Sequence, residues 1–257
     1  YIFSFAPDSQ PSRITISLQN GSGKFGAINT SAVSRSFSHH AELTGMESLS
    51  LWYAFEESGG NLIKDFSKGQ IDGNLINGGR IPGKFGQSLS LVPGDYVTTN
   101  GESLSLSTSM TVSLWAKILE DAQGSLVRSG QFNLQYHDDQ TIRGSVYTGS
   151  SWKTVKGRSK PGAWQHYALT YNGNDLKLYG NSVLMDTMEV SGYLNWGDGA
   201  DHLLYIGKYG VNGWDSKVEI DDFRVYSKAF SGDEIISLYG NGSGDVGIRP
   251  LVIGNSP

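Results

Sequence analysis

The sequence predicts an all-β fold, a sandwich of two antiparallel sheets, for three reasons. Short runs in which apolar and polar residues alternate recur along most of the chain, which is the pattern of half-buried strands. Clusters of Gly, Asn and Asp separate these runs, as in residues 171–175, and such residues favour tight turns. The chain has 257 residues, 34 of them Gly and 11% aromatic, so it can fill a large core between short strands.

Residues 1–47 contain two alternating runs, at 1–5 and 13–18, followed by a Ser-rich stretch. Two strands alone do not form a stable domain. We therefore expect this N-terminal β segment to be the end of a preceding domain or a set of strands used in assembly. The chain starts at Tyr1 without Met, which indicates a processed protein or an excised part of a longer one.

Residues 48–240 carry the dense strand pattern and are expected to form the sandwich domain. The predicted strands are 49–55, 87–91, 95–98, 110–117, 131–136, 166–171, 175–179, 202–207 and 218–226. One short helix should follow, because Ser231 and Glu234 have the spacing of a capping box and Gly240 is placed to end the helix. We expect residues 241–257 to be a linker that leads into a further strand.

The composition argues against several classes of function. The formal net charge is −5 and the basic residues are scattered, whereas nucleic-acid binding needs a dense basic face. No apolar run approaches the roughly 20 residues that span a bilayer, so membrane insertion is not expected. The chain has no Cys. It also shows no phosphate-binding loop, dinucleotide fingerprint or Ser nucleophile elbow, so the sequence gives no support for nucleotide, redox or acyl-transfer chemistry.

Nine motifs between Leu49 and Tyr239 follow one another in the order and spacing of a known family. They are LWYAFEESGG from Leu51, DFSKGQIDG from Asp65, GKFG from Gly83, DYV from Asp95, TVSLWAK from Thr111, WQHYALTY from Trp164, LKLY from Leu176, IG from Ile206 and IDDFRVYSKAFS from Ile220. Together they resemble the concanavalin A-like, laminin-G-like (LamG-like) jelly-roll domains of secreted proteins. The resemblance implies two sheets of six or seven strands packed face to face, with carbohydrate or other proteins as ligands. The family pattern is interrupted at Gly180, where we expect the strand to turn one residue early.

The resemblance also implies a structural calcium ion between the strand at 218–226 and the loop at 65–73. Calcium takes several oxygen ligands from carboxylates, carbonyls and water. The expected ligands are Asp65 or Asp72, Asp221 and the carbonyl of Gly69. The alternative is that Asp65 caps a turn and Asp221 accepts hydrogen bonds from backbone N–H groups.

Three carboxylates within residues 219–222 raise the question of a glucanase, because this fold also hosts such hydrolases. Retaining hydrolysis needs two carboxyl groups about 5 Å apart, and Glu219 and Asp221 could share a strand face. The second catalytic Glu of the pattern is missing, since Phe223 and Arg224 follow, so we expect no enzyme activity. Alternation along the strand predicts one face with Asp221, Phe223 and Val225, and another with Ile220, Asp222, Arg224 and Tyr226, where Asp222 and Arg224 would form an exposed charge ladder.

Aromatic rings outside the predicted strands are the candidate ligand-binding residues, because sugar rings stack on aromatic faces. They lie in Gly-rich segments that we expect to be loops: Trp152, Tyr193, Trp196, Tyr209 and Trp214. Three further Trp residues lie in strand patterns and are expected in the core: Trp52, Trp115 and Trp164. Two His-containing clusters lack the spacing of a transition-metal site and are interpreted as solvated turns: His39, His40 and Glu42, and His137, Asp138 and Asp139.

The combined interpretation is a non-catalytic extracellular or cell-surface module that recognises glycans or a protein partner and holds a structural Ca²⁺. The alternative is a structural subunit or repeat of a surface assembly. In that case the terminal strands would pair with neighbouring domains or with copies of the same chain, because strand edges with free N–H and C=O groups invite pairing.

Overall fold

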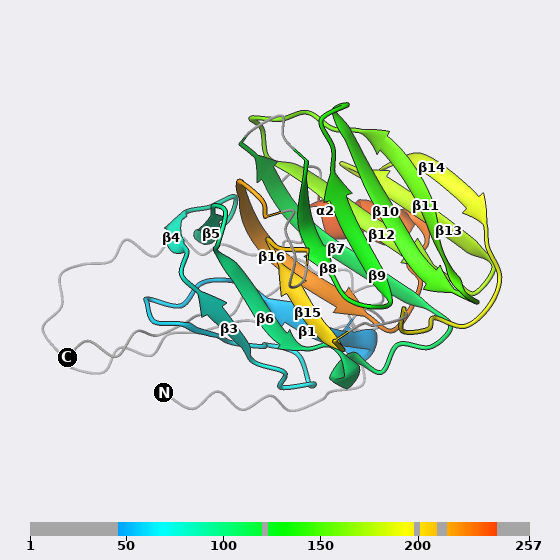
Figure 1. The fold of residues 1–257 in the computed structure, drawn as a ribbon, viewed down its shortest axis with the longest axis horizontal. Coiled ribbons are helices and arrows are strands. Elements are labelled where there is room, and N and C mark those ends of the chain that lie inside the picture. Colours follow the sequence, from blue (N-terminus) through cyan, green and yellow to red (C-terminus); the bar gives the residue numbers. More distant parts are fainter. Residues whose placement is uncertain (1–45, 120–122, 198–200, 210–214, 241–257) are drawn as a thin grey trace, which may run out of the picture.

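The computed structural model describes residues 46–119, 123–197, 201–209 and 215–240, which form a sandwich of two eight-stranded antiparallel sheets (Figure 1). Sheet A has the order β14-β13-β12-β7-β16-β5-β4, and β1 also pairs with β16. Its strands are β1 (Leu49–Tyr53), β4 (Gly79–Pro82), β5 (Gln87–Leu91), β7 (Met110–Ile118), β12 (Gln165–Tyr171), β13 (Asp175–Gly180), β14 (Val183–Glu189) and β16 (Val218–Tyr226).

Sheet B has the order β11-β10-β9-β8-β15-β6-β3-β2. Its strands are β2 (Leu62–Ile63), β3 (Gly73–Ile76), β6 (Tyr96–Asn100), β8 (Gly124–Arg128), β9 (Phe132–Tyr136), β10 (Thr141–Thr148), β11 (Ser151–Arg158) and β15 (Leu203–Ile206). A short 3₁₀ turn, η1 (Glu102–Leu104), follows β6. The predicted fold class is confirmed, with more strands in each sheet than the six or seven expected.

The main core lies between the two sheets and takes apolar side chains from both. On β7, for example, Val112 and Leu114 belong to the core, whereas Ser113 between them does not. The sheets approach closely at Gly144 of β10, where an added Cβ would lie 2.4 Å from Cδ1 of Leu169 on β12. Burying an aliphatic or aromatic side chain of this kind contributes about 1.5–3 kcal/mol to folding, so this interface dominates the stability of the domain.

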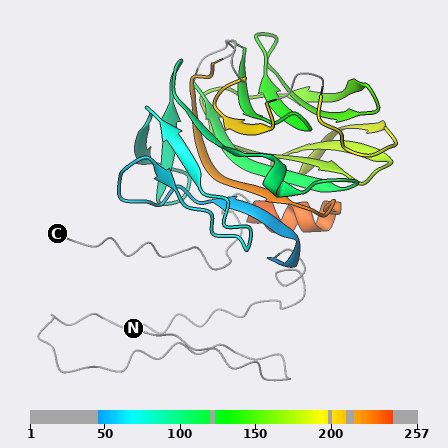
Figure 2. The ribbon, with the colours of Figure 1, turned by 60° about the horizontal axis from the view of Figure 1, so that its bottom comes forward.

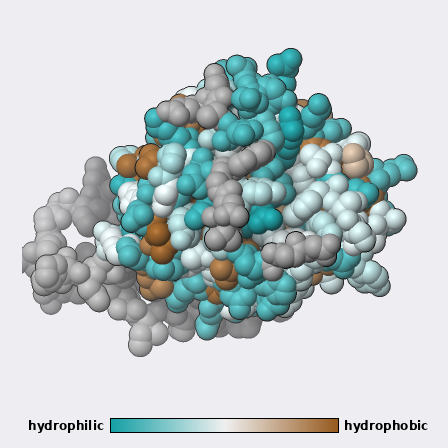
Figure 3. All heavy atoms as spheres, in the orientation of Figure 1, coloured by the Kyte–Doolittle hydropathy of each residue, from teal (hydrophilic) through white to brown (hydrophobic). Residues whose placement is uncertain are grey.

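Helix α2 (Gly232–Tyr239) packs on the outer side of sheet A (Figure 2). The predicted capping box is confirmed at Ser231 and Glu234, and Gly240 ends the helix in a left-handed conformation with φ 56°. Ile235 and Leu238 of the helix lie in a second apolar cluster, built on outward-facing residues of sheet A. Sheet B lies on the opposite side of the sandwich, and the side of the molecule seen in Figure 1 is mostly hydrophilic or neutral with scattered apolar residues (Figure 3).

Strand β16 departs from simple alternation at a β-bulge. Its register with β7 shifts between Asp221 and Arg224, and Asp222 has φ 51°. The extra residue moves the side chains of the second half of the strand to the other face, so the predicted face of Asp221, Phe223 and Val225 is wrong. Ile220 lies in the core together with Phe223 and Val225. The exposed charge ladder is also wrong, because Asp222 and Arg224 are each only 5% exposed and form a buried ion pair of 3.1 Å.

Two other local predictions differ from the structure. The segment around Trp152 is not a loop: β10 and β11 form a long hairpin, whose Gly and Ser residues hide the strand pattern in the sequence. Strand β13 continues through Gly180, and the turn falls one step later, at Asn181 and Ser182, both with positive φ. A two-residue turn of this conformation matches the twist of the flanking strands.

Several predictions concern parts of the chain that lie outside the described residues. These include the strands at 1–5 and 13–18, the His39–Glu42 cluster and the segment 241–257. The proposed limits of the three segments therefore stay predictions. Within the part of the chain that the structure describes, no helix has the length and apolar character needed to cross a membrane.

Candidate functional site

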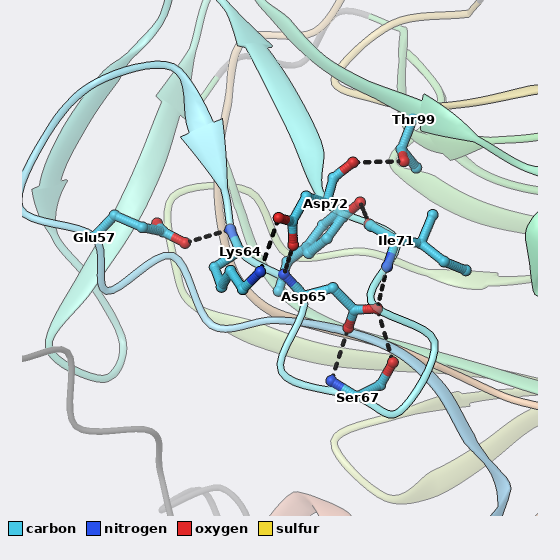
Figure 4. A network of polar contacts seen from close by, with 8 residues as sticks. Glu57, Lys64, Asp65, Ser67, Ile71, Asp72 and Thr99 are labelled. Atoms are coloured by element: carbon cyan, nitrogen blue, oxygen red, sulfur yellow. Dashed lines mark hydrogen bonds and ion pairs between the residues drawn. The ribbon is translucent and has the colours of Figure 1, made fainter.

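Asp65 is the centre of a local hydrogen-bond network (Figure 4). Its Oδ1 accepts bonds from the backbone amides of Trp52 at 2.9 Å and Ser67 at 2.8 Å. Its Oδ2 accepts bonds from Oγ of Ser67 and from the amide of Ile71, both at 2.8 Å. Four protein donors thus occupy both oxygens of a carboxylate that is 3% exposed. This confirms the alternative in which Asp65 caps a turn, here the loop that follows its own bridge to β1.

Asp72 extends the same network. Its Oδ1 accepts a bond from the amide of Asp65 at 2.9 Å, and its Oδ2 pairs with Nζ of Lys64 at 2.9 Å. Burial alone would raise the pKa of the Asp72 carboxyl, but the Asp65 amide and the Lys64 ammonium outweigh it, so the pKa lies below its usual value. The amide of Gly69 donates to Oγ of Ser67, and this bond stabilises the loop.

Asp221 belongs to a different network, on the outer side of sheet A. It is fully buried, and its Oδ2 accepts a bond from the amide of Phe85 at 2.8 Å. This confirms the alternative in which Asp221 accepts a backbone N–H bond. Among the described residues, no group of three or more His, Asp or Glu side chains is gathered as a metal site requires. The arrangement does not fit a calcium ion coordinated by Asp65, Gly69, Asp72 and Asp221.

The carboxylates on β16 are also committed to structural contacts. Glu219 forms an ion pair with Lys117 of β7 at 3.2 Å, and Asp221 is bound to the turn that contains Phe85. A retaining hydrolase needs two carboxyl groups facing its substrate. Glu219 and Asp221 therefore do not form such a pair in this arrangement.

Four of the five predicted ligand-binding rings lie among the described residues: Trp152 and Tyr193 near the β10–β11 end of sheet B, Trp196 beside Gly101 after β6, and Tyr209. Trp152 on β11 packs edge-on against Tyr147 of β10, with ring centroids 5.4 Å apart. Trp196 stacks on His202 at 4.6 Å and 28°. Tyr193 is 66% exposed and lies next to Leu194, which bridges to Thr148 at the end of β10.

Tyr209 is placed differently. The guanidinium of Arg128 lies 4.2 Å from the centre of its ring, so one face of the ring already binds a cation. Trp214 lies outside the described residues. Two of the three Trp residues expected in the core, Trp52 and Trp115, are buried at 5% and 2% exposure, whereas Trp164 is only partly buried.

The outer face of sheet B carries a continuous row of residues that the sequence does not reveal. Strand registers place one residue of each strand in this outer row: Leu62, Asn74, Thr98, Tyr205, Arg128, Asn133, Ser145 and Thr154. The residues next to them along the strands, such as Leu75, Val97 and Val155, belong to the core. The row therefore faces away from the core and is mostly polar. Its middle is shielded, since Asn133 is 3% exposed and Ser145 4% exposed, while Asn74 and Thr154 near its two ends are exposed.

Two hollows mark the margins of sheet B. The first hollow, of about 580 Å³, lies at the β2–β3–β6 end of the outer row, and its lining includes Leu62, Gln70, Asn74, Thr98, Asn100 and Ser103. The second, of about 490 Å³, lies beside the β10–β11 turn and is lined by residues such as Ser150, Lys153 and Glu189. The first hollow thus gathers hydroxyl and amide side chains, and the second lies beside the strand pair that carries the rings of Tyr147 and Trp152. Sugar recognition combines such polar groups with aromatic rings.

The chain matches a model of the concanavalin A-like lectin/glucanases superfamily over residues 92–236, more than half of its length. No curated protein matches its sequence.

Solved structures with a similar fold include several botulinum neurotoxin binding domains. The binding domain of serotype D is 17% identical with a TM-score of 0.62, covering 77% of this chain and 52% of its own. A structure of botulinum neurotoxin type C, whose cell entry is dependent upon interaction with two ganglioside molecules, is 16% identical with a TM-score of 0.63, covering 77% of this chain and 52% of its own. A DC binding domain in complex with rat synaptotagmin II is 15% identical with a TM-score of 0.61, covering 76% and 52%. This chain spans about half of the length of those chains. At these identities the similarity shows a shared fold.

Proposed function

Because the chain belongs to the concanavalin A-like lectin/glucanase superfamily, we propose that it is a non-catalytic module that recognises carbohydrate outside the cell or at its surface. The observation that carries this proposal is the placing of free polar groups and partly exposed rings at the two ends of sheet B. Trp152 and Tyr193 lie at one end, and the first hollow lies at the other, close to Trp196. A sugar needs both kinds of group, since its ring faces are apolar and its edge is polar.

The superfamily includes both lectins and glucanases, so membership alone does not decide between binding and hydrolysis. We favour binding because Glu219 and Asp221, the candidate carboxylates on β16, serve Lys117 and Phe85. The resemblance to laminin-G-like domains of secreted proteins supports an extracellular location. The neurotoxin structures are precedents for binding by this fold. Cell entry of one toxin is dependent upon gangliosides, which are glycolipids, and another binding domain forms a complex with a protein. We propose no calcium ion, since the carboxylates of Asp65, Asp72 and Asp221 already have protein partners.

A glycan array tests this function directly. The purified chain is applied at low salt and at physiological salt, beside the variants Trp152→Ala and Trp196→Ala and the control Ile236→Ala. Ile236 is 48% exposed on α2, on the opposite side of the sandwich, so its loss should leave binding unchanged. Loss of a stacking ring should weaken binding about tenfold or more. Absence of any glycan signal from the folded parent chain would contradict the proposal.

A second function, as a structural subunit of a surface assembly, is favoured by the edge strand β14. Its apolar side chains Val183, Leu184 and Met188 are 66%, 47% and 38% exposed. Apolar side chains gathered on an edge strand are a common contact between chains. Light scattering across a range of concentrations tests this: self-association that Val183→Lys with Leu184→Lys abolishes supports assembly through β14, and a monomer at every concentration opposes it.

A further inference from the structure

The first hollow offers a set of hydrogen-bonding side chains that have no partner among the described residues. The side-chain amide of Asn74, exposed on β3, makes no hydrogen bond there, and neither do the side chains of Gln70 and Ser103. Asn100 accepts a bond from the amide of Glu102 through Oδ1 at 3.0 Å, which fixes its orientation and leaves its Nδ2 hydrogens to donate. Hydrogen-bond donors and acceptors, from amide and hydroxyl side chains, therefore converge on the first hollow.

An apolar side chain lies on one side of these groups, and an aromatic ring packs against the chain on the other. Leu62, at the edge of the sheet, lines the hollow and is 57% exposed. On the other side, an added Cβ on Gly101 would lie 3.0 Å from the ring of Trp196, so the indole closes directly on the residue that follows Asn100. The ring is held there by His202, on which it stacks and whose Nδ1 contacts the carboxylate of Glu102. The ring thus holds the segment that carries Asn100 in position before any ligand arrives.

The charges at the hollow select among sugars. Of its described lining residues only Asp72 is charged, and Lys64 already neutralises that carboxylate at 2.9 Å. Glu102 beside it faces His202. No lining cation is therefore available for the carboxylate or sulfate of an acidic sugar, while amides and hydroxyls are the usual partners of sugar hydroxyl groups.

We infer that the first hollow binds one neutral hexose unit of the glycan, with Asn74 and Asn100 bonded to its hydroxyl groups and Leu62 beside its apolar surface. This inference rests on the proposed function and adds the class of sugar and the two residues that select it. It also separates the roles of the rings: Trp196 packs against Gly101 beside the hollow, whereas Trp152 and Tyr193 contact a more distant part of an extended ligand.

Side-chain amide signals in protein labelled with ¹⁵N-asparagine provide the test. The probes are methyl β-D-glucopyranoside and methyl β-D-galactopyranoside, with glucuronate and glucosamine as charged counterparts. A neutral glycoside should shift the Asn74 and Asn100 signals in a saturable way and leave Asn174 unchanged, since Asn174 is exposed at the turn before β13. A shift produced by glucuronate or glucosamine but by neither neutral probe would overturn the inference.

Substitution gives the second arm. Asn74→Ala and Asn100→Ala should each weaken binding of the best neutral glycan from the array about tenfold, as expected for a lost pair of hydrogen bonds. Asn174→Ala is the matched control, and circular dichroism confirms that the variants are folded. If array glycans bind and both variants bind as the parent does, the inference fails and the proposed function stands. If no glycan binds the folded parent, both fail.

Discussion

Trp52 and Asp222 are joined by a hydrogen bond although they lie 170 positions apart: the indole Nε1 donates to Oδ1 of the carboxylate at 2.8 Å. Nε of Arg224 donates to the same oxygen at 3.1 Å, and its guanidinium lies 4.5 Å from the centre of the Trp52 ring. All three residues are about 95% buried. This network connects β1 to β16 on the outer side of sheet A.

Replacement of Asp222 should therefore be costly. Asp222→Ala leaves a buried guanidinium without its described carboxylate, and such a loss typically destabilises a protein by about 3–5 kcal/mol. The free energy of unfolding in urea measures the effect. The double variant Asp222→Ala with Arg224→Met should be more stable than the single one, because it removes the buried charge as well. Asp138→Ala, on the exposed turn after β9, serves as the control; a single variant as stable as this control would contradict the role given to Asp222.

His166 makes the stability of the domain depend on pH. It is 1% exposed, its Nε2 lies 2.8 Å from Oγ of Ser113, and burial lowers its pKa to about 4, with Arg224 adding to the shift and Asp222 opposing it. The unfolded chain, with a pKa near 6.5 at this residue, binds the proton first. Stability is therefore unaffected above about pH 6.5 and falls as the pH drops from there to 4, by about 3 kcal/mol in total.

The variant His166→Gln isolates that effect, since Gln keeps a hydrogen-bonding group beside Ser113 but does not titrate. Urea unfolding of both proteins between pH 7.5 and 4.5 should show the parent losing about 2–3 kcal/mol more than the variant. Parallel curves would mean that His166 does not titrate differently in the folded and unfolded states.

Gly83 is required by the close approach of the turn at 83–86 to β16. An added Cβ would lie 2.8 Å from Oδ2 of Asp221 and equally close to the backbone of Gln87. Gly83→Ala should therefore destabilise the fold by about 1–3 kcal/mol, seen as a lower melting temperature. Gly79→Ala is the matched control, at the start of the strand β4 that precedes this turn, where a Cβ meets nothing within 4 Å; equal melting temperatures for the two variants would oppose this explanation.

Removal of calcium tests whether the domain lacks the structural calcium ion that its resemblance to laminin-G-like domains implies. Since four protein donors already occupy the carboxylate of Asp65, chelation should leave the melting temperature unchanged, and Asp65→Ala should destabilise the fold equally with and without added Ca²⁺. A melting temperature that falls on chelation and recovers with Ca²⁺, but not with Mg²⁺, would restore the calcium site predicted from the sequence.

The sequence predicts what depends on local pattern. The helix is one example, since Ser231, Glu234 and Gly240 act within a few residues of one another. The nine alternating strands are another. The bulge at Asp222 was missed because the faces of the strand were assigned by strict alternation, whereas the core residues Ile220 and Phe223 are three positions apart. The β10–β11 hairpin is hidden for a related reason: Gly144 and Gly157 occupy inward positions where the opposite sheet or Met185 leaves no room for a larger side chain.

The candidate site was even less accessible to prediction from sequence. Trp196 can be recognised as a ring outside the predicted strands, but Asn74 of the first hollow lies more than a hundred positions away in the sequence, in a segment of ordinary composition. The outer row exists only through the registers of eight strands, which no single stretch of sequence encodes. The alternation of polar residues in 96–100 and 151–156 is the one local signal that could have indicated part of it.

The way β14 meets β11 decides how another molecule can approach this domain. The carboxylate of Asp186 accepts a bond from the amide of Lys156 on β11 at 3.0 Å, and Met185 fills the space above Gly157. The edge strands β11 and β14 thus contact each other, and the backbone amide of Lys156, which could otherwise bond to a strand of another molecule, already has a partner. Val183 and Leu184 can offer a partner side-chain contact there, but an additional β-strand would find its free edge at β2 or β4. Among the described strands, association through strand pairing is therefore expected on the side of the sandwich that carries β2 and β4.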